Sequence, residues 1–347
     1  MESISLSIAR RIVPELLEVL QNRAKILNRI WLMQPIGRRA LAAELGTTER
    51  VLRAELDFLK QQGLLVAATT GMSLSVEGQS LLEELDILLA AIEGRISLAQ
   101  QLSKVLKIEQ VVVVGGDSDQ EEWVKDTLGY QAGVYLQSVL QPSDIVAVTG
   151  GTTMAAVAKM MPAKAERMNV KIVPARGGVG ENLSLQANTI ASELAARLGG
   201  TSTMLHVPDR LGEDTLELIV KEPEVQRRLQ EIRSASIVLH GIGDAMKMAE
   251  RRQSRREEIT LLREQGAVAE AFGYYFDSDG KVVHEMNIIG LRISDLTQVR
   301  AVMGVAGGRS KSAAIVAAAK AYPMDVLVTD EGAAKAVLQN TFREELR

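Results

Sequence analysis

From Lys107 onward the chain repeats one hydrophobic pattern, a short continuous apolar run that ends in Gly, Thr, Ser or Asp. Most of these runs are followed by residues with helical periodicity. Continuous apolar strands that alternate with helices predict a parallel sheet covered on both faces, a Rossmann-like, doubly wound α/β fold. Ligands in such folds bind beyond the carboxyl ends of the strands, where these polar and glycine residues collect. The runs lie within Val111–Gly116, Asp144–Thr153, Val170–Gly178, Ala235–Ala245, Val299–Gly308 and Met324–Ala334.

A different pattern, with helical spacing and charged faces, precedes this region. Residues Arg39–Leu45 predict a short helix, Gly46 a tight turn, and Thr47 the cap of a second helix. The side of the second helix expected to be buried carries Val51, Leu52, Leu56 and Leu59. Its other side carries polar residues and cations, as a DNA recognition helix does: Thr48, Arg50, Arg53 and Lys60. The alternative is an ordinary helical hairpin with a solvated charged face.

The residues around this pair of helices favour the DNA-binding interpretation. Gly63–Gly78 predicts two short strands around Thr70 and Gly71, which would form the wing of a winged helix-turn-helix. Arg38 and Arg39, at the start of the first helix, are placed to contact backbone phosphates or to be solvated. Residues 1–65 contain ten Lys and Arg against seven Asp and Glu. The net charge of −4 argues against bulk binding of nucleic acid but allows this local basic face.

The pattern predicts three parts: a winged helix-turn-helix domain over residues 1–90, a linker helix over 91–106, and an effector-binding and oligomerisation domain over 107–347. Arg10–Trp31 predicts two amphipathic helices, broken near Gln21 and Asn22. Gln79–Leu106 predicts one long helix. Its apolar stripe would pack against its own domain or against a second subunit.

The composition argues against several classes of protein. No apolar run reaches the roughly 18 residues of a membrane span, and the N-terminus has no small-residue cleavage site, so a soluble cytoplasmic protein is expected. The absence of cysteine excludes disulfides, thiolate metal sites and cysteine catalysis. The three histidines, His206, His240 and His284, lie far apart in the sequence, so no metal site is expected.

The run that ends in TGGTTM carries the clearest chemistry. Gly150 and Gly151 let backbone N–H groups approach an anion, Thr152 and Thr153 can donate hydroxyl hydrogen bonds, and a helix N-terminus adds partial positive charge. The alternative is a glycine turn at a strand–helix corner. A nucleotide-binding interpretation fails, because Met246 replaces the third glycine of GxGxxG and no GxxxxGK[ST] occurs. The sequence therefore favours a small phosphorylated ligand.

Other strand ends supply charge and hydrogen-bonding groups. Arg176 stands at the end of a predicted strand, and Gln186 and Lys311 stand where predicted helices begin. Glu270 is the last residue of the segment QGAVAE, and Arg251 belongs to RRQSRR. Taken singly, each is consistent with a surface charge, and a solvated helix face is the default for Arg251. Together, cations that hold phosphates and a carboxylate that accepts from hydroxyls suit a doubly phosphorylated sugar.

The chain resembles the SorC/DeoR-type sugar-sensing bacterial repressors. The resemblance rests on PIGRR and ERVLR in the N-terminal part and on TGGTTM, VPARGG, HGIGDAM and AGGRSKSAAI in the rest. It implies a repressor of glycolytic genes that fructose 1,6-bisphosphate releases from double-stranded operator DNA, without a cofactor. It also implies a DNA-binding motif over Arg38–Asp57 and dimers that assemble into tetramers. The effector residues that it implies are Gly150, Gly151, Thr152, Thr153, Arg176, Gln186, Arg251, Glu270 and Lys311.

An enzyme is the rival interpretation, since the resemblance relates the C-terminal domain in fold to sugar-phosphate isomerases and glucosamine-phosphate deaminases. Such chemistry needs a base at the sugar and usually a second acid or base. Asp244 and Glu270 are the candidates, but Asp244 is expected to cap the helix that follows it. We therefore expect a regulator without catalytic residues. A pure oligomerisation scaffold would not explain the glycine loops.

Overall fold

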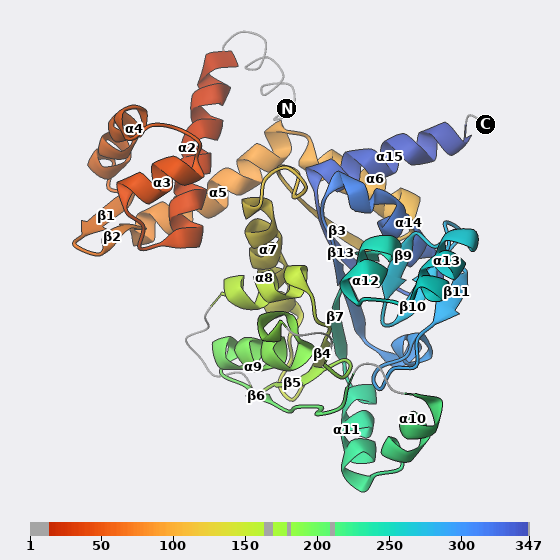
Figure 1. Ribbon diagram of the computed structural model, residues 1–347. Helices are drawn as coiled ribbons and strands as arrows, with labels where there is room; N and C mark the ends of the chain where they lie inside the picture. Colours follow the sequence, from red (N-terminus) through yellow and green to blue (C-terminus); the bar gives the residue numbers. More distant parts are fainter. Residues whose placement is uncertain (1–13, 163–168, 179–181, 209–211, 346–347) are drawn as a thin grey trace. The chain divides into compact units, whose positions relative to one another are not determined.

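The computed structural model describes residues 14–162, 169–178, 182–208 and 212–345 (Figure 1). The chain divides into two compact units between Ser97 and Leu98. This division falls inside the segment predicted as a linker helix. One continuous helix over Gln79–Leu106 is wrong: α5 (Val76–Ile92) ends and α6 (Arg95–Leu106) begins around Gly94, whose φ of +75° stops a helix.

The first unit is a winged helix-turn-helix. It contains α2 (Pro14–Met33), α3 (Arg38–Glu44), α4 (Glu49–Gln61), the hairpin strands β1 (Leu65–Ala68) and β2 (Gly71–Leu74), and α5. Its core is built from leucine and isoleucine side chains of these helices, among them Leu27, Ile30, Leu41, Leu52 and Leu59. At the wing a Cβ on Gly71 would lie 2.9 Å from the Ile36 backbone, so only glycine allows this approach.

Three local expectations for the first unit are wrong. The described part of Arg10–Trp31 lies in the single helix α2, because the exposed Gln21 and Asn22 cost a helix only about 0.7 kcal/mol each at most. The cap of α4 is Thr48, whose hydroxyl accepts from the Val51 N–H at 3.4 Å, and not Thr47. Val51 is 64% exposed, since the buried stripe runs through Leu52, Leu56 and Leu59.

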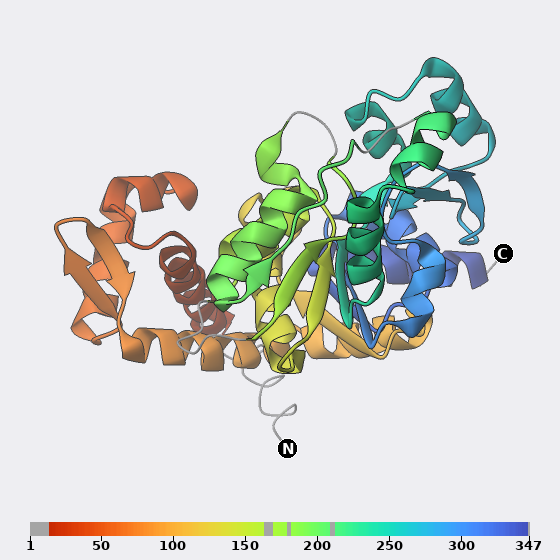
Figure 2. The ribbon, with the colours of Figure 1, turned by 90° about the horizontal axis from the view of Figure 1, so that it is seen from below.

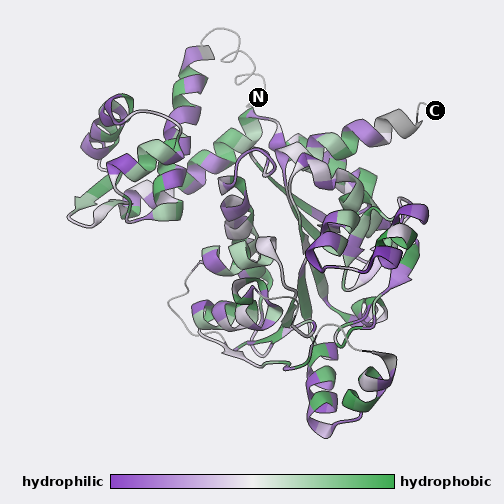
Figure 3. Cartoon of the chain, viewed as in Figure 1, coloured by the Kyte–Doolittle hydropathy of each residue, from purple (hydrophilic) through white to green (hydrophobic). Residues whose placement is uncertain are grey.

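The second unit is built on a seven-stranded, wholly parallel sheet of order β3-β13-β12-β7-β4-β5-β6. Helices cover both faces, as Figure 2 shows, and the strands between them are hydrophobic (Figure 3). The doubly wound α/β fold is therefore confirmed. The strands are β3 (Gln110–Val114), β4 (Ile145–Val148), β5 (Lys171–Pro174), β6 (Thr201–Ser202), β7 (Ile237–Gly241), β12 (Ala301–Val305) and β13 (Val326–Asp330).

Two groups of helices form the outer layers. The core on one face includes side chains of α7 (Trp123–Val139), α8 (Thr152–Met160) and α9 (Ala187–Leu198). The core on the other face includes α6, α11 (Pro223–Arg233), α14 (Ser312–Ala321) and α15 (Glu331–Glu345). Within the described ranges no helix is long and apolar enough to span a membrane.

The order of the strands creates a crevice between β4 and β7. After β4 the chain proceeds outward through β5 and β6, and it then returns to β7 and proceeds the other way through β12 and β13. The connections that follow β4 and β7 therefore diverge. In open α/β sheets this switch point, at the carboxyl ends of the strands, is where ligands bind.

A small antiparallel sheet, which the sequence analysis did not predict, is inserted between β7 and β12. Its strand order is β11-β10-β9-β8, and the helices α12 (Ala245–Arg251) and α13 (Arg256–Glu264) lie in the chain between β8 and β9. The strands are β8 (Gly243–Asp244), β9 (Ala269–Ala271), β10 (Tyr274–Phe276) and β11 (Val282–Glu285). Glu270 thus lies in the middle of β9 and not at the end of a parallel strand.

Candidate functional site

The TGGTTM segment connects β4 to α8 at the switch point. A Cβ on Gly150 would lie 2.6 Å from the Leu185 carbonyl oxygen, so this position requires glycine. Gly151 has a φ of +117°, and its N–H donates to the same carbonyl at 2.9 Å. Both glycines therefore follow from the close passage of the backbone beside Leu185.

The first turn of α8 is free to bind an anion. No side chain caps the helix, whose N-cap residue is Gly151. Thr152 is exposed at the start of the helix, and Thr153 is buried. Backbone N–H groups at a helix N-terminus, with the helix dipole behind them, bind phosphate without further charge.

Lys311 lines the same cavity as this helix N-terminus. It belongs to a second loop, which contains the short 3-10 helix η3 (Arg309–Lys311). The loop is held in place by two carboxylates: Asp330 accepts from the Gly308 N–H at 2.7 Å, and Asp119 accepts from the Ser310 N–H at 2.7 Å. Burial of the ammonium, together with the charge of Lys125, lowers the pKa of Lys311. A bound anion would offset both effects.

A buried group of charges forms another wall. Glu270, on β9, accepts from Arg252 at 2.8 Å and lies 3.7 Å from Arg176. Burial would raise the pKa of Glu270, but Arg252 and Arg176 outweigh it and hold this pKa below its usual value. Arg176 is positioned by hydrogen bonds of its neighbours, since Gly177 N–H donates to Ile289 O at 3.0 Å.

These elements enclose two adjoining cavities of about 190 and 450 Å³. Both are lined by Gly150, Gly151, Thr152, Arg176 and Arg251, so we treat them as one cleft. The smaller cavity extends to Thr153, Glu270 and Lys311, and the larger one extends to Gln186. The structure thus brings together all nine residues proposed for the effector; their role in binding stays a prediction.

The sequence analysis missed two cations of this cleft. Arg252 is buried and pairs with Glu270, whereas its neighbour Arg251 is exposed at the cleft. Lys247 also lines the cleft, and its ammonium donates to Ser310 Oγ at 3.3 Å. Arg252 lies within the RRQSRR segment and Lys247 shortly before it. Successive residues of a helix point about 100° apart, which is the signal that separates the inward arginine from the outward one.

Asp244, the candidate base of the enzyme interpretation, caps α12. Its carboxylate accepts from the Lys247 N–H at 2.9 Å, as expected from the sequence. It also lines the cleft. An Asp that serves as a helix cap is fixed in orientation by that role.

The first unit carries the candidate DNA-binding surface. Arg38, at the start of α3, and Arg50 and Arg53, on α4, are exposed and form no ion pair within the described ranges. Arg39 is also exposed but pairs with Glu49 at 3.0 Å. Thr48 is exposed while it caps α4. Arg38, Arg50 and Arg53 are therefore available to contact phosphates, whereas Arg39 already has an ion-pair partner.

Comparisons with known proteins agree with both units. Residues 19–89 match the CggR N-terminal DNA binding domain, and residues 90–339 match the family of sugar-binding domains called Sugar-bind. The chain belongs to the SorC family of sugar-binding transcriptional regulators. A SorC family transcriptional regulator from Enterococcus faecalis is 39% identical, with a TM-score of 0.66, over 70% of this chain and 99% of that one.

Two further similar proteins match along nearly the whole chain. The central glycolytic genes regulator of Priestia megaterium is 45% identical over 96% of this chain and 98% of its own. The full-length sorbitol operon regulator SorC of Klebsiella pneumoniae, at 20% identity and a TM-score of 0.67, shares the fold over 93% of this chain and 98% of its own. Both matches therefore extend over the two units of the chain.

Proposed function

We propose that this SorC family member is a repressor of glycolytic genes that fructose 1,6-bisphosphate releases from operator DNA. The observation that carries the proposal is the convergence of an uncapped helix N-terminus with Lys311 and Arg251 in one cleft at the switch point. The 45% identity to a protein named central glycolytic genes regulator supports the choice of genes. We place the regulator in the cytoplasm, where glycolytic sugar phosphates occur.

The cleft suits a sugar with a phosphate at each end. One phosphate would take the N-terminus of α8 and Lys311, and the other the side of Arg176 and Arg251. Gln186 and Glu270 would then meet the hydroxyl groups between them. The larger cavity alone, at about 450 Å³, lies in the range of roughly 300–1,000 Å³ that is typical of small-molecule sites.

A sugar-phosphate isomerase or deaminase is the alternative, and the charges of the cleft disfavour it. A general base works best when its pKa lies near the working pH, whereas the arginines beside Glu270 hold its pKa low. Asp244 serves as the cap of α12. Turnover of a sugar phosphate by the purified protein would overturn the regulator proposal.

The proposed regulation requires that effector and operator oppose each other. If the effector weakens the affinity for DNA, then DNA weakens the affinity for the effector by the same factor. We propose that homodimers, assembled into tetramers, carry this coupling through a shift of the subunit interface that changes the spacing of the recognition helices.

The test is a titration of the operator complex with fructose 1,6-bisphosphate, fructose 6-phosphate and glucose 6-phosphate, read by fluorescence anisotropy of labelled DNA. Only the bisphosphate should release the DNA. The double variant Thr152→Ala and Lys311→Ala should bind the operator normally and ignore the effector. If the bisphosphate leaves the wild-type complex intact, the effector assignment is wrong.

A further inference from the structure

Glu270 directs all of its polar contacts within the described residues to one of its two oxygens. Oε1 accepts from Arg252 Nη2 at 2.8 Å and from the Gly273 N–H at 2.9 Å, and it lies 3.7 Å from Arg176 Nη1. The residue is 4% exposed, yet it lines the cleft. Oε2 is therefore the oxygen that remains to accept from a ligand.

Arg252 holds the carboxylate in this orientation from behind. Only 1% of its side chain is exposed, so it is far more enclosed than the neighbouring Arg251. Its Nη2 donates to Glu270, and its Nη1 donates to Tyr275 Oη at 3.4 Å and to Met286 Sδ at 3.0 Å. One guanidinium thereby joins β9, β10 and the segment after β11, and its rigid fork fixes the direction of the carboxylate.

The charge balance keeps Glu270 ionised. Although burial alone would raise the pKa of Glu270, Arg252 and Arg176 lower it further than burial raises it. An ionised carboxylate only accepts hydrogen bonds. Next to Glu270 the cleft thus favours a hydroxyl donor over an anion. The N-terminus of α8 and Lys311 instead favour a phosphate.

We propose that Arg252 is a positioning residue that makes Glu270 a hydroxyl acceptor, so that the cleft selects a phosphorylated polyol over a hydroxyl-free anion of equal charge. This inference rests on the proposed function, because it assumes that the cleft binds a sugar bisphosphate. It adds that the cleft recognises the hydroxyl groups between the two phosphates.

The test compares two ligands that carry the same phosphates. Calorimetric titration measures the affinity of the full-length protein for fructose 1,6-bisphosphate and for hexane-1,6-diol bisphosphate, which lacks hydroxyl groups. A hydrogen bond to a charged group corresponds to about a 10- to 100-fold preference for the sugar in the wild type. Glu270→Gln and Arg252→Met should reduce this ratio several-fold and leave the affinity for the diol bisphosphate within about twofold.

Two further readouts separate positioning from a merely structural role. In Arg252→Met, Glu270 keeps one arginine of two, so its pKa rises and the preference for the sugar should fall at a higher pH than in the wild type. Arg252→Lys keeps the charge without the fork, so its preference should be reduced and independent of pH; it also serves if the Met variant fails to fold. Arg256→Met, at an exposed arginine of α13, is the matched control and should behave as the wild type.

The outcomes distinguish the two proposals. If the wild type binds neither bisphosphate, the proposed function fails and the inference fails with it. If the wild type prefers the sugar and both Arg252 variants keep the full preference, or lose both ligands equally, only the positioning role is overturned.

Discussion

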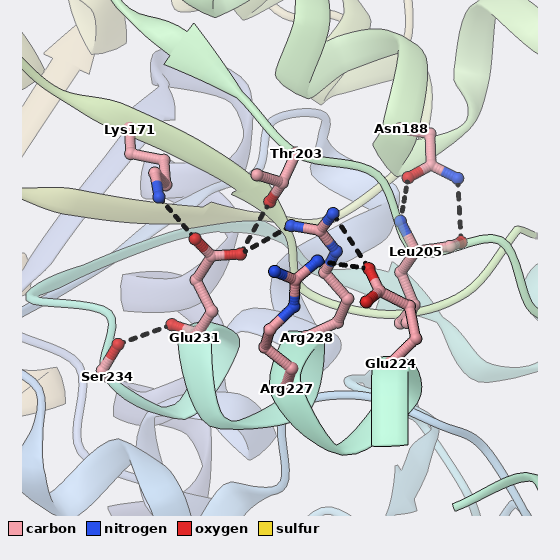
Figure 4. Close-up of polar contacts among 9 residues, drawn as sticks. All are labelled: Lys171, Asn188, Thr203, Leu205, Glu224, Arg227, Arg228, Glu231 and Ser234. Atoms are coloured by element: carbon pink, nitrogen blue, oxygen red, sulfur yellow. Dashed lines mark hydrogen bonds and ion pairs between the residues drawn. The ribbon is translucent and has the colours of Figure 1, made fainter. Parts of the chain in front are cut away.

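The second unit contains two groups of basic side chains that differ in how their charge is compensated. One group, shown in Figure 4, lies where α11 packs on β5, beside the edge strand β6. There Glu231 accepts from Lys171 at 2.5 Å and from Arg228 at 3.3 Å, and Glu224 accepts from Arg227 at 2.7 Å. Every cation of this network has a carboxylate partner.

The other group lines the cleft at the carboxyl ends of β4 and β7. Lys247, Arg251 and Lys311 form no ion pair within the described part of the chain, although all three face one cavity. Cations that converge without a direct ion-pair partner repel one another and cost stability. Such an arrangement is expected where a ligand supplies further negative charge, so the comparison separates a structural network from a candidate binding site.

The largest effect is expected at Lys311. Lys311→Ala should weaken fructose 1,6-bisphosphate about 10- to 150-fold, because a charge-assisted hydrogen bond contributes about 1.5–3 kcal/mol. Calorimetric titration measures the loss. Lys171→Ala is the matched control, since it removes a lysine that already has a carboxylate partner. Equal losses of affinity in Lys311→Ala and Lys171→Ala would contradict the distinction between the two groups of basic side chains.

A second test applies the same distinction to the DNA-binding surface. Arg53→Ala should weaken operator binding about 10-fold, whereas Arg39→Ala should cost less because Arg39 already pairs with Glu49. If Arg53 contacts a phosphate, the slope of log affinity against log salt should become shallower by about 1. Anisotropy titrations at several salt concentrations would show this. An unchanged affinity for Arg53→Ala would remove this residue from the proposed interface.

The smallest effect is expected within the paired network. Burial would raise the pKa of Glu231, but hydrogen bonds from Lys171 and Thr203 outweigh it and lower this pKa. Its ionised form therefore stabilises the fold at neutral pH, and this contribution disappears as the pH falls through the lowered pKa. Glu231→Gln should cost up to about 1 kcal/mol in urea unfolding at pH 7, and this cost should shrink as the pH falls through the lowered pKa. A cost that grows on acidification would contradict the pairing.

The sequence predicted those features that depend on local patterns. Continuous apolar runs such as Ile145–Val148 predicted buried parallel strands, and the spacing of Leu52, Leu56 and Leu59 predicted the packed side of α4. The nine residues proposed for the cleft were found in one place because the carboxyl ends of parallel strands meet at one edge of a sheet.

What escaped prediction depends on tertiary contacts or on single-residue shifts. The strand β8 (Gly243–Asp244) is too short to leave an alternating pattern, so the antiparallel sheet that carries Glu270 was not foreseen. Arg252 differs from Arg251 only in the direction in which the end of α12 turns it. The capping of α4 by Thr48 in place of Thr47 is a shift of one residue, within the usual uncertainty of helix ends.

The central claim is that Lys247, Arg251 and Lys311 lie in the cleft without ion pairs in the described part of the chain because a phosphorylated sugar binds them. Thermal unfolding of the wild type and of Lys311→Ala, each with fructose 1,6-bisphosphate or with fructose, tests it directly. Because a ligand that binds only the folded state raises Tm, the bisphosphate should raise the wild-type Tm by several degrees and fructose should not. At the same bisphosphate concentration the rise should be much smaller in Lys311→Ala, because its affinity is lower. An equal rise in the wild type and in Lys311→Ala would contradict the account.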